Sequence, residues 1–220
     1  MPYHLLPVPF AIVVTLLYWR AREHNRLRQV AVLQPLGSAL ITLVALLSLF
    51  RPNVNTTLTL WITAGLLLSF VGDVNNVNME DERTVFVGLV IFVFAYLAYA
   101  IGLTVVNGLH RLDLLPGAIL LVLYAATMRY LWPGLGNMQV PVLLYGLVLP
   151  VLVWRAASTF FGEVFNPGQS LLLTAGAGAL YAGDFEYGIH RFRRPEFHAR
   201  YGPVLYLGGQ LLIALSPSYF

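Results

Sequence analysis

Long apolar stretches alternate with short polar segments along the whole chain. A helix needs about 20 residues to cross a bilayer, and eight stretches reach or approach that length. Most polar segments between them are short, so we expect consecutive helices to pack antiparallel. The pattern predicts an all-α fold, a polytopic membrane helical bundle of about eight transmembrane helices forming a single domain over residues 1–220. The expected helices lie near Leu5–Trp19, Val30–Phe50, Leu58–Val77, Val85–Val106, Leu114–Leu131, Val140–Phe160, Ser170–Tyr187 and Tyr201–Ser216.

One sequence frame occurs twice in the chain. TAGLLLSFVGD occupies Thr63–Asp73, and TAGAGALYAGD occupies Thr174–Asp184. The stretches that follow them, GLVIFVFAYL at 88–97 and GPVLYLGGQL at 202–211, share glycine, valine and aromatic positions. The frames lie on the third and the seventh expected helices, so both frames run in the same direction through the membrane. We therefore predict a parallel internal repeat of four helices plus four, with both terminal aspartates at the same depth.

Composition narrows the class of protein. The chain is 58% hydrophobic and only 10% charged, against about 25% charged residues in ordinary soluble domains. Cysteine is absent, which excludes disulfides and a thiol nucleophile, and lysine is absent, which excludes a Schiff-base mechanism. The net charge of +3 is small. We interpret it as a signal of membrane topology and expect no nucleic-acid partner.

The arginines are distributed unevenly between alternate loops. Three lie in the even-numbered loops, and the other ten lie in the odd-numbered loops. Because cytoplasmic loops of membrane proteins are enriched in basic residues, we expect the odd loops in the cytoplasm and both termini outside, in the cytoplasmic (inner) membrane. The ten are Arg20, Arg22, Arg26, Arg28, Arg83, Arg129, Arg191, Arg193, Arg194 and Arg200.

Carboxylates inside the apolar stretches are the candidates for chemistry. Asp73 and Asp184 end the two repeated frames. Burying a carboxylate costs several kcal/mol unless it is paired or neutralised, so an acid kept there indicates a functional site. Two carboxylates in one poorly hydrated site do not readily ionise together, which provides an acid and a base from one residue type. The alternative is that each aspartate caps a loop or pairs with an arginine.

Polar side chains near the two aspartates predict a cleft that opens to the cytoplasmic leaflet. We expect its walls to contact the substrate, its mouth to bind lipid headgroups or a substrate phosphate, and one asparagine to lie a helical turn beyond Asp73. His190 and His198 lie in an arginine-rich loop, which argues against a metal, and we expect no cofactor. The expected substrate-binding residues are Tyr96, Tyr99, Tyr206, Gln210, Asn76, Arg191 and Arg194.

Together these residues resemble the YhhN-like lysoplasmalogenase family of integral membrane proteins. The resemblance rests on LQPL around Pro35, the Gly-Asp pairs, GLVIFVFAYLAY, GALYAGDFEYGIHRFRRP and YLGGQLLIALS. It implies eight helices and a proposed active site of two aspartates, which maps onto Asp73 and Asp184. It also implies hydrolysis of the vinyl ether bond of lysoplasmalogens, with a fatty aldehyde and glycerophospho-ethanolamine or -choline as products. The implied partners are a lysophospholipid substrate and membrane lipids.

The chain departs from the family pattern at three positions. The family usually has Lys-Pro where this chain has Gln34-Pro35, Ser-Asp where it has Gly183-Asp184, and commonly His where it has Tyr96. These departures leave the substrate open. A small-molecule or proton-coupled transporter also suits the repeat and the buried acids, although the aspartate helices lack the proline-broken centres expected of transport helices. A non-catalytic lipid-binding member is the third alternative.

Overall fold

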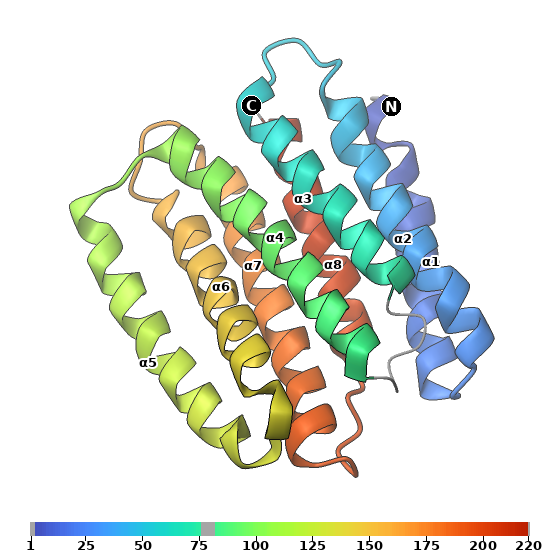
Figure 1. Cartoon of the computed structure of the whole chain (residues 1–220). Helices are drawn as coiled ribbons and strands as arrows, with labels where there is room; N and C mark the ends of the chain where they lie inside the picture. Colours follow the sequence, from blue (N-terminus) through green and yellow to red (C-terminus); the bar gives the residue numbers. More distant parts are fainter. Residues whose placement is uncertain (1–2, 76–81, 220) are drawn as a thin grey trace.

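The computed structural model describes residues 3–75 and 82–219 (Figure 1). Within these residues the chain forms eight α-helices and no strand, which confirms the predicted all-helical fold. Each helix lies within a few residues of its predicted range. The helices are α1 (Pro7–Glu23), α2 (Leu27–Ser48), α3 (Thr56–Asn75), α4 (Glu82–Asn107), α5 (Leu114–Leu131), α6 (Gln139–Ser158), α7 (Pro167–Gly188) and α8 (Gly202–Leu215).

Over the described residues, six helical segments are long and apolar enough to cross a membrane. They correspond to α1 to α6. Helix α8 has 14 residues, and α7 contains several glycines and alanines together with Asp184 and Glu186. Figure 1 shows α7 and α8 lying among the other helices of one bundle. The protein is therefore a multi-pass helical membrane bundle, and α7 and α8, the two helices outside this set, lie within the assembly.

Consecutive helices run in opposite directions, and the two chain ends lie at the same end of the bundle (Figure 1). The odd-numbered connections consequently share the opposite end, where α3 and α7 finish. A short π-helical turn, Ile189–Arg193, extends α7 there. The aspartates that end the two frames and most of the arginines therefore lie toward the same end of the bundle.

The two halves of the chain pack in equivalent ways. Helix α3 packs closely against α4, and α7 packs closely against α8. A Cβ atom on Gly65 would meet the Ala95 carbonyl oxygen at 2.8 Å, and one on the equivalent Gly176 would meet the Gly209 carbonyl oxygen at 2.8 Å. Glycine at these positions lets the paired backbones approach each other, which is how membrane helices associate without an apolar driving force. The two helix pairs that carry the repeated stretches therefore pack alike.

Candidate functional site

Asp73 lies near the end of α3 and is buried, with 1% of its surface exposed. Gln34 donates from Nε2 to Oδ1 at 2.7 Å, and the Tyr206 hydroxyl donates to Oδ2 at 2.9 Å. The Ser38 hydroxyl donates to the same Oδ2. Gln34 and Ser38 lie one turn apart on α2, so both side chains point toward α3. The three donors occupy both oxygens, an arrangement that suits an ionised carboxylate, which can only accept hydrogen bonds.

Asp184, at the equivalent position of α7, has a different set of neighbours. Its Oδ2 accepts hydrogen bonds from the hydroxyl of Tyr145 on α6 at 2.5 Å and from the hydroxyl of Tyr96 on α4 at 3.0 Å. No residue in 3–75 or 82–219 donates a hydrogen bond to its Oδ1. One oxygen of Asp184 is therefore fixed by two hydroxyls, while the other is available to hold a proton or to face a ligand.

Each carboxylate receives a tyrosine hydroxyl from the other half of the chain. Tyr206, in the second half, reaches Asp73 in the first, and Tyr96, in the first half, reaches Asp184 in the second. The Phe92 ring lies between these tyrosines, with its centroid 5.9 Å from that of Tyr206 and 6.0 Å from that of Tyr96. The two acidic clusters are thus neighbours separated by a layer of aromatic rings.

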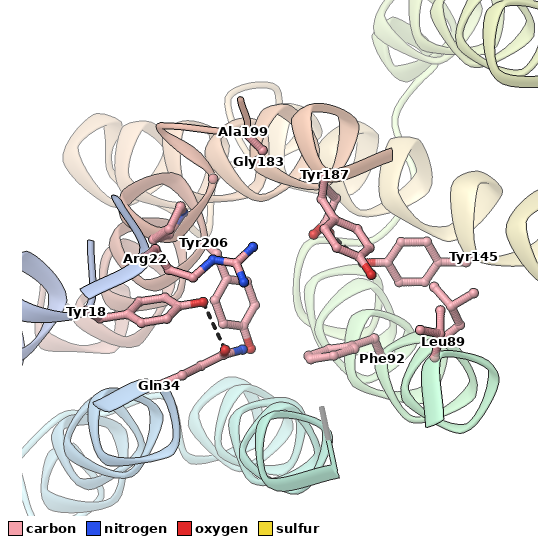
Figure 2. A pocket seen from close by; sticks show the side chains of 14 residues that line it. Tyr18, Arg22, Gln34, Leu89, Phe92, Tyr145, Gly183, Tyr187, Ala199 and Tyr206 are labelled. Atoms are coloured by element: carbon pink, nitrogen blue, oxygen red, sulfur yellow. Dashed lines mark hydrogen bonds between the residues drawn. The ribbon is translucent and has the colours of Figure 1, made fainter. Parts of the chain in front are cut away.

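A cavity of about 100 Å³ adjoins Asp184, and we call it the polar cavity (Figure 2). Asp73 does not line it and lies behind two of its walls, Gln34 and Tyr206, to which it is hydrogen-bonded. The full lining comprises Tyr18, Arg22, Gln34, Val85, Leu89, Phe92, Tyr145, Gly183, Asp184, Tyr187, Ala199, Gly202, Pro203 and Tyr206.

Arg22 is the one cation among the described residues that line the polar cavity. It forms no ion pair with any residue in the described part of the chain. Figure 2 shows it beside Tyr18 and Tyr206, with Tyr145 on the opposite side. A guanidinium in this position has its donors available for an anionic ligand group such as a phosphate.

The structure brings four of the sequence-predicted residues together as the two acidic clusters: Asp73, Asp184, Tyr96 and Tyr206. Tyr99 and Gln210 lie deeper in the bundle and do not line the polar cavity. The Tyr99 hydroxyl donates to Gln210 Oε1 at 2.5 Å, and Gln210 Nε2 donates to Ser69 Oγ at 3.0 Å. These contacts join α3, α4 and α8, so Tyr99 and Gln210 brace the helices that carry the site.

Three other predicted binding residues are not placed in the polar cavity. Asn76 lies outside the described residues. Arg191 is in the turn after α7 and Arg194 is exposed beyond it, at the same end of the bundle as the site, but neither lines the cavity. Glu186 is tied instead to the start of α8, since its Oε1 accepts a hydrogen bond from the Tyr201 backbone N–H at 3.2 Å.

Gln34, Ser38, Tyr145 and Arg22 are among the residues at the site that the sequence analysis missed. Gln34 precedes Asp73 by 39 residues, and Tyr145 precedes Asp184 by the same 39 residues. Extending the repeat one helix toward the N-terminus would have paired these two positions and found both donors. Arg22 carries no such signal, because it is one of several arginines in the same polar segment.

The arrangement is suited to proton transfer to a bound lipid-like molecule. The polar cavity contains the Asp184 carboxyl group, which has one available oxygen, and the Arg22 guanidinium, which has no ion pair among the described residues. The second carboxylate, Asp73, lies behind the cavity wall. A positioned carboxyl group can serve as a general acid and then as a base for water. The cavity also opens at the end of the bundle where a lipid headgroup would lie.

Comparison with known proteins gives one family. The sequence model of the YhhN family matches residues 29–217, which is most of the chain. No curated protein and no solved structure matches the chain. The match includes both aspartate frames and the helices that donate to them, and it confirms the resemblance seen in the sequence. The chain belongs to the YhhN family.

Proposed function

We propose that this protein is a membrane-embedded hydrolase of the lysoplasmalogenase type, which cleaves the vinyl ether bond of a lysoplasmalogen. The products are a fatty aldehyde and a glycerophospho-ethanolamine or -choline. The observation that carries the proposal is Asp184, which lines a cavity together with Arg22. Within the described residues, Asp184 has one carboxyl oxygen without a donor and Arg22 has no ion pair. Membership of the YhhN family supports the same choice of reaction.

Asp184 is the general acid in this proposal. Vinyl ether hydrolysis begins when a proton is added to the alkene carbon farther from the ether oxygen, which leaves an oxocarbenium ion. The Tyr96 and Tyr145 hydroxyls hold Oδ2, so Oδ1 carries the proton and delivers it. Asp184, now a carboxylate, accepts a proton from the water that attacks the oxocarbenium carbon. The resulting hemiacetal collapses to the aldehyde and the glycerol hydroxyl, with no net change in protons.

Asp73 supports this chemistry without touching the substrate. It is the ionised member of the pair, because Gln34, Ser38 and Tyr206 all donate to it. Its negative charge lies behind the Tyr206 wall of the cavity and stabilises the cation formed on the other side. Asp73 is therefore a positioning and electrostatic residue, and Asp184 is the catalytic one.

Arg22 binds the phosphate of the substrate. The guanidinium can donate two parallel hydrogen bonds to phosphate oxygens, and no carboxylate in the described part of the chain competes for it. The excess of arginine at this end of the bundle supports a cytoplasmic position for it by the positive-inside rule, with both termini outside. The substrate would then enter from the inner leaflet of the cytoplasmic membrane.

The test is a paired assay of the purified protein in detergent or nanodiscs. Vinyl-ether and acyl lysophospholipids with the same headgroup are incubated in parallel, and aldehyde release is measured. We expect aldehyde from the vinyl-ether lipid alone and no fatty acid from the acyl lipid. Absence of aldehyde from a folded protein, or fatty acid from the acyl lipid, would contradict the proposal.

A further inference from the structure

A second cavity lies on the other side of Asp184, between α4, α5, α6 and α7. We call it the apolar cavity. Its walls are mostly hydrocarbon, from residues such as Met128, Leu131, Val142 and Phe192. The Thr127 and Tyr181 hydroxyls in its wall are 2.8 Å apart and hydrogen-bond to each other, which uses one of their two O–H donors. The apolar cavity therefore suits a hydrocarbon group and offers little to a polar ligand.

The two cavities share part of their lining. Leu89, Tyr145, Asp184 and Tyr187 line both of them. A molecule that extends from one cavity into the other must pass these four residues, of which Asp184 is the acid. The polar cavity has the guanidinium of Arg22, whereas the apolar cavity has no charged lining residue besides Asp184. The chemistry of the two cavities matches the two ends of a single-chain phospholipid.

Helix α5 contributes its buried residues to the wall of the apolar cavity. Within its range, the buried residues are Thr127, Met128 and Leu131, and all three line this cavity. Most of the other α5 residues are exposed, so a chain that fills the cavity can continue along this helix into the bilayer. Gly146 on α6 also lines the cavity. Because glycine has no side chain, space remains beside it, and Met128 bounds that space. A Cβ at Gly146 would meet the Met128 Cε at 2.8 Å.

We propose that the apolar cavity binds the first part of the hydrocarbon chain of a lysophospholipid whose glycerophosphate occupies the polar cavity. The bond between the chain and the glycerol then lies at Asp184. The inference rests on the proposed function for its choice of lipid, but it concerns binding and does not require turnover. According to this inference, α5 and α6 determine which hydrocarbon chains bind, and the polar cavity around Arg22 determines which headgroups bind.

The test uses a lipid that cannot be cleaved by this route. A 1-O-alkyl lysophospholipid lacks the alkene, and a photoreactive diazirine in the first part of its chain reports which residues are near. We expect crosslinks in residues 127–131 and 142–149 of the wild-type protein, suppressed by excess unlabelled lipid. Crosslinks that map elsewhere, or that are not suppressed by unlabelled lipid, would overturn the inference.

A substitution sharpens this test. Gly146→Leu fills the cavity and should reduce crosslinking about tenfold, the loss expected when about two methylene groups are no longer buried. Adding Met128→Ala to it restores room and should recover crosslinking. Gly178→Leu is the matched control, because a Cβ there meets no atom within 4 Å. Equal crosslinking of folded Gly146→Leu and wild type would contradict the inference. If Gly146→Leu does not fold, the positions of the crosslinks in the wild-type protein decide whether the inference holds.

The crosslinking result and the hydrolase assay can fail separately. Crosslinks in the cavity without aldehyde release from a vinyl-ether lipid would keep the chain site and remove the hydrolase. Aldehyde release with crosslinks outside the cavity would keep the hydrolase and remove the chain site.

Discussion

Asp73 and Asp184 stand at equivalent positions of the two halves, yet their surroundings differ. Asp73 is closed in by three donors, whereas Asp184 has both of its donors on one oxygen and adjoins two cavities. The repeat sets where each carboxylate lies, and the neighbouring helices decide what it can do. A duplicated frame can therefore place one acid as a fixed charge and the other as a reactive group.

The difference can be traced to one turn of the helix that precedes each aspartate. Gln34 and Tyr145 are equivalent, and both donate to the aspartate of their own half. One turn later, Ser38 supplies another donor to Asp73, whereas α6 has Leu149, which is buried and has no hydroxyl. Asp184 consequently lacks the donor that completes the Asp73 site.

The largest expected effect comes from removing the reactive acid. Asp184→Asn should lower aldehyde release about 10²- to 10⁴-fold, the usual contribution of a general acid. Its melting temperature should stay close to that of the wild type, because Asp184 is only partly buried and an amide oxygen can still accept from Tyr96 and Tyr145. Aldehyde release and thermal melting in the same detergent check both parts. Undiminished turnover would remove Asp184 from the mechanism.

Arg22 gives the next largest effect. Arg22→Gln should raise KM for the lysophospholipid about tenfold, a loss of about 1.4 kcal/mol in binding, with a small change in kcat. Arg194→Gln removes the same charge from an exposed residue that does not line the cavity, and its KM should stay at the wild-type value. Steady-state kinetics of the two variants measure the contrast. A larger KM increase for Arg194→Gln would assign the phosphate to the arginine-rich loop.

Asp73 should affect stability more than Asp184 does. In Asp73→Asn, the amide N–H₂ would face a buried donor, which costs about 1–3 kcal/mol. We expect a clear fall in the midpoint of thermal unfolding, together with reduced activity. Ser38→Ala removes a single donor and should fall between this variant and the wild type. If Asp73→Asn and Asp184→Asn melt at the same temperature, the contrast between a sealed and an open carboxylate is wrong.

The smallest effects test the equivalence of the two halves. Gly65→Ala and Gly176→Ala each bring a methyl group within 2.8 Å of a backbone carbonyl oxygen, so each should destabilise the bundle by about 1–3 kcal/mol. Gly208→Ala adds a methyl group in open space and should not destabilise it. Melting temperatures of the three variants give the comparison. The larger loss is expected at Gly65, because a Cβ there would also clash with the Tyr99 ring. An unchanged melting temperature in either variant would contradict the close approach of the two backbones.

The fold follows from the sequence because apolar length alone determines where membrane helices begin and end. Helix α5, for example, has the predicted bounds Leu114–Leu131. The repeated frame likewise predicted that Asp73 and Asp184 would lie at one end of the bundle. These features depend on local pattern and on counting helices, which a sequence displays directly.

The rest of the site depends on side-chain direction, which the sequence does not display. Arginine enrichment identifies one end of the bundle, but it does not show that Arg22 points inward while Arg194 is exposed. Tyr96 and Gln210 occupy corresponding positions in the stretches 88–97 and 202–211, yet Tyr96 binds Asp184 and Gln210 binds Ser69 and Tyr99. Equivalent positions acquired different partners because the surrounding residues are not repeated.

The exchange of tyrosines between the halves also bears on how such a chain could have arisen. Each four-helix unit supplies the hydroxyl that the aspartate of the other unit needs, so a single unit leaves its own carboxylate without that donor. Tyr96 and Tyr206 do not occupy equivalent positions of the repeat, because Tyr96 corresponds to Gln210 and Tyr206 corresponds to Phe92. Each half has therefore acquired its own tyrosine after the halves diverged, and neither half could now be replaced by a second copy of the other without the loss of a tyrosine donor.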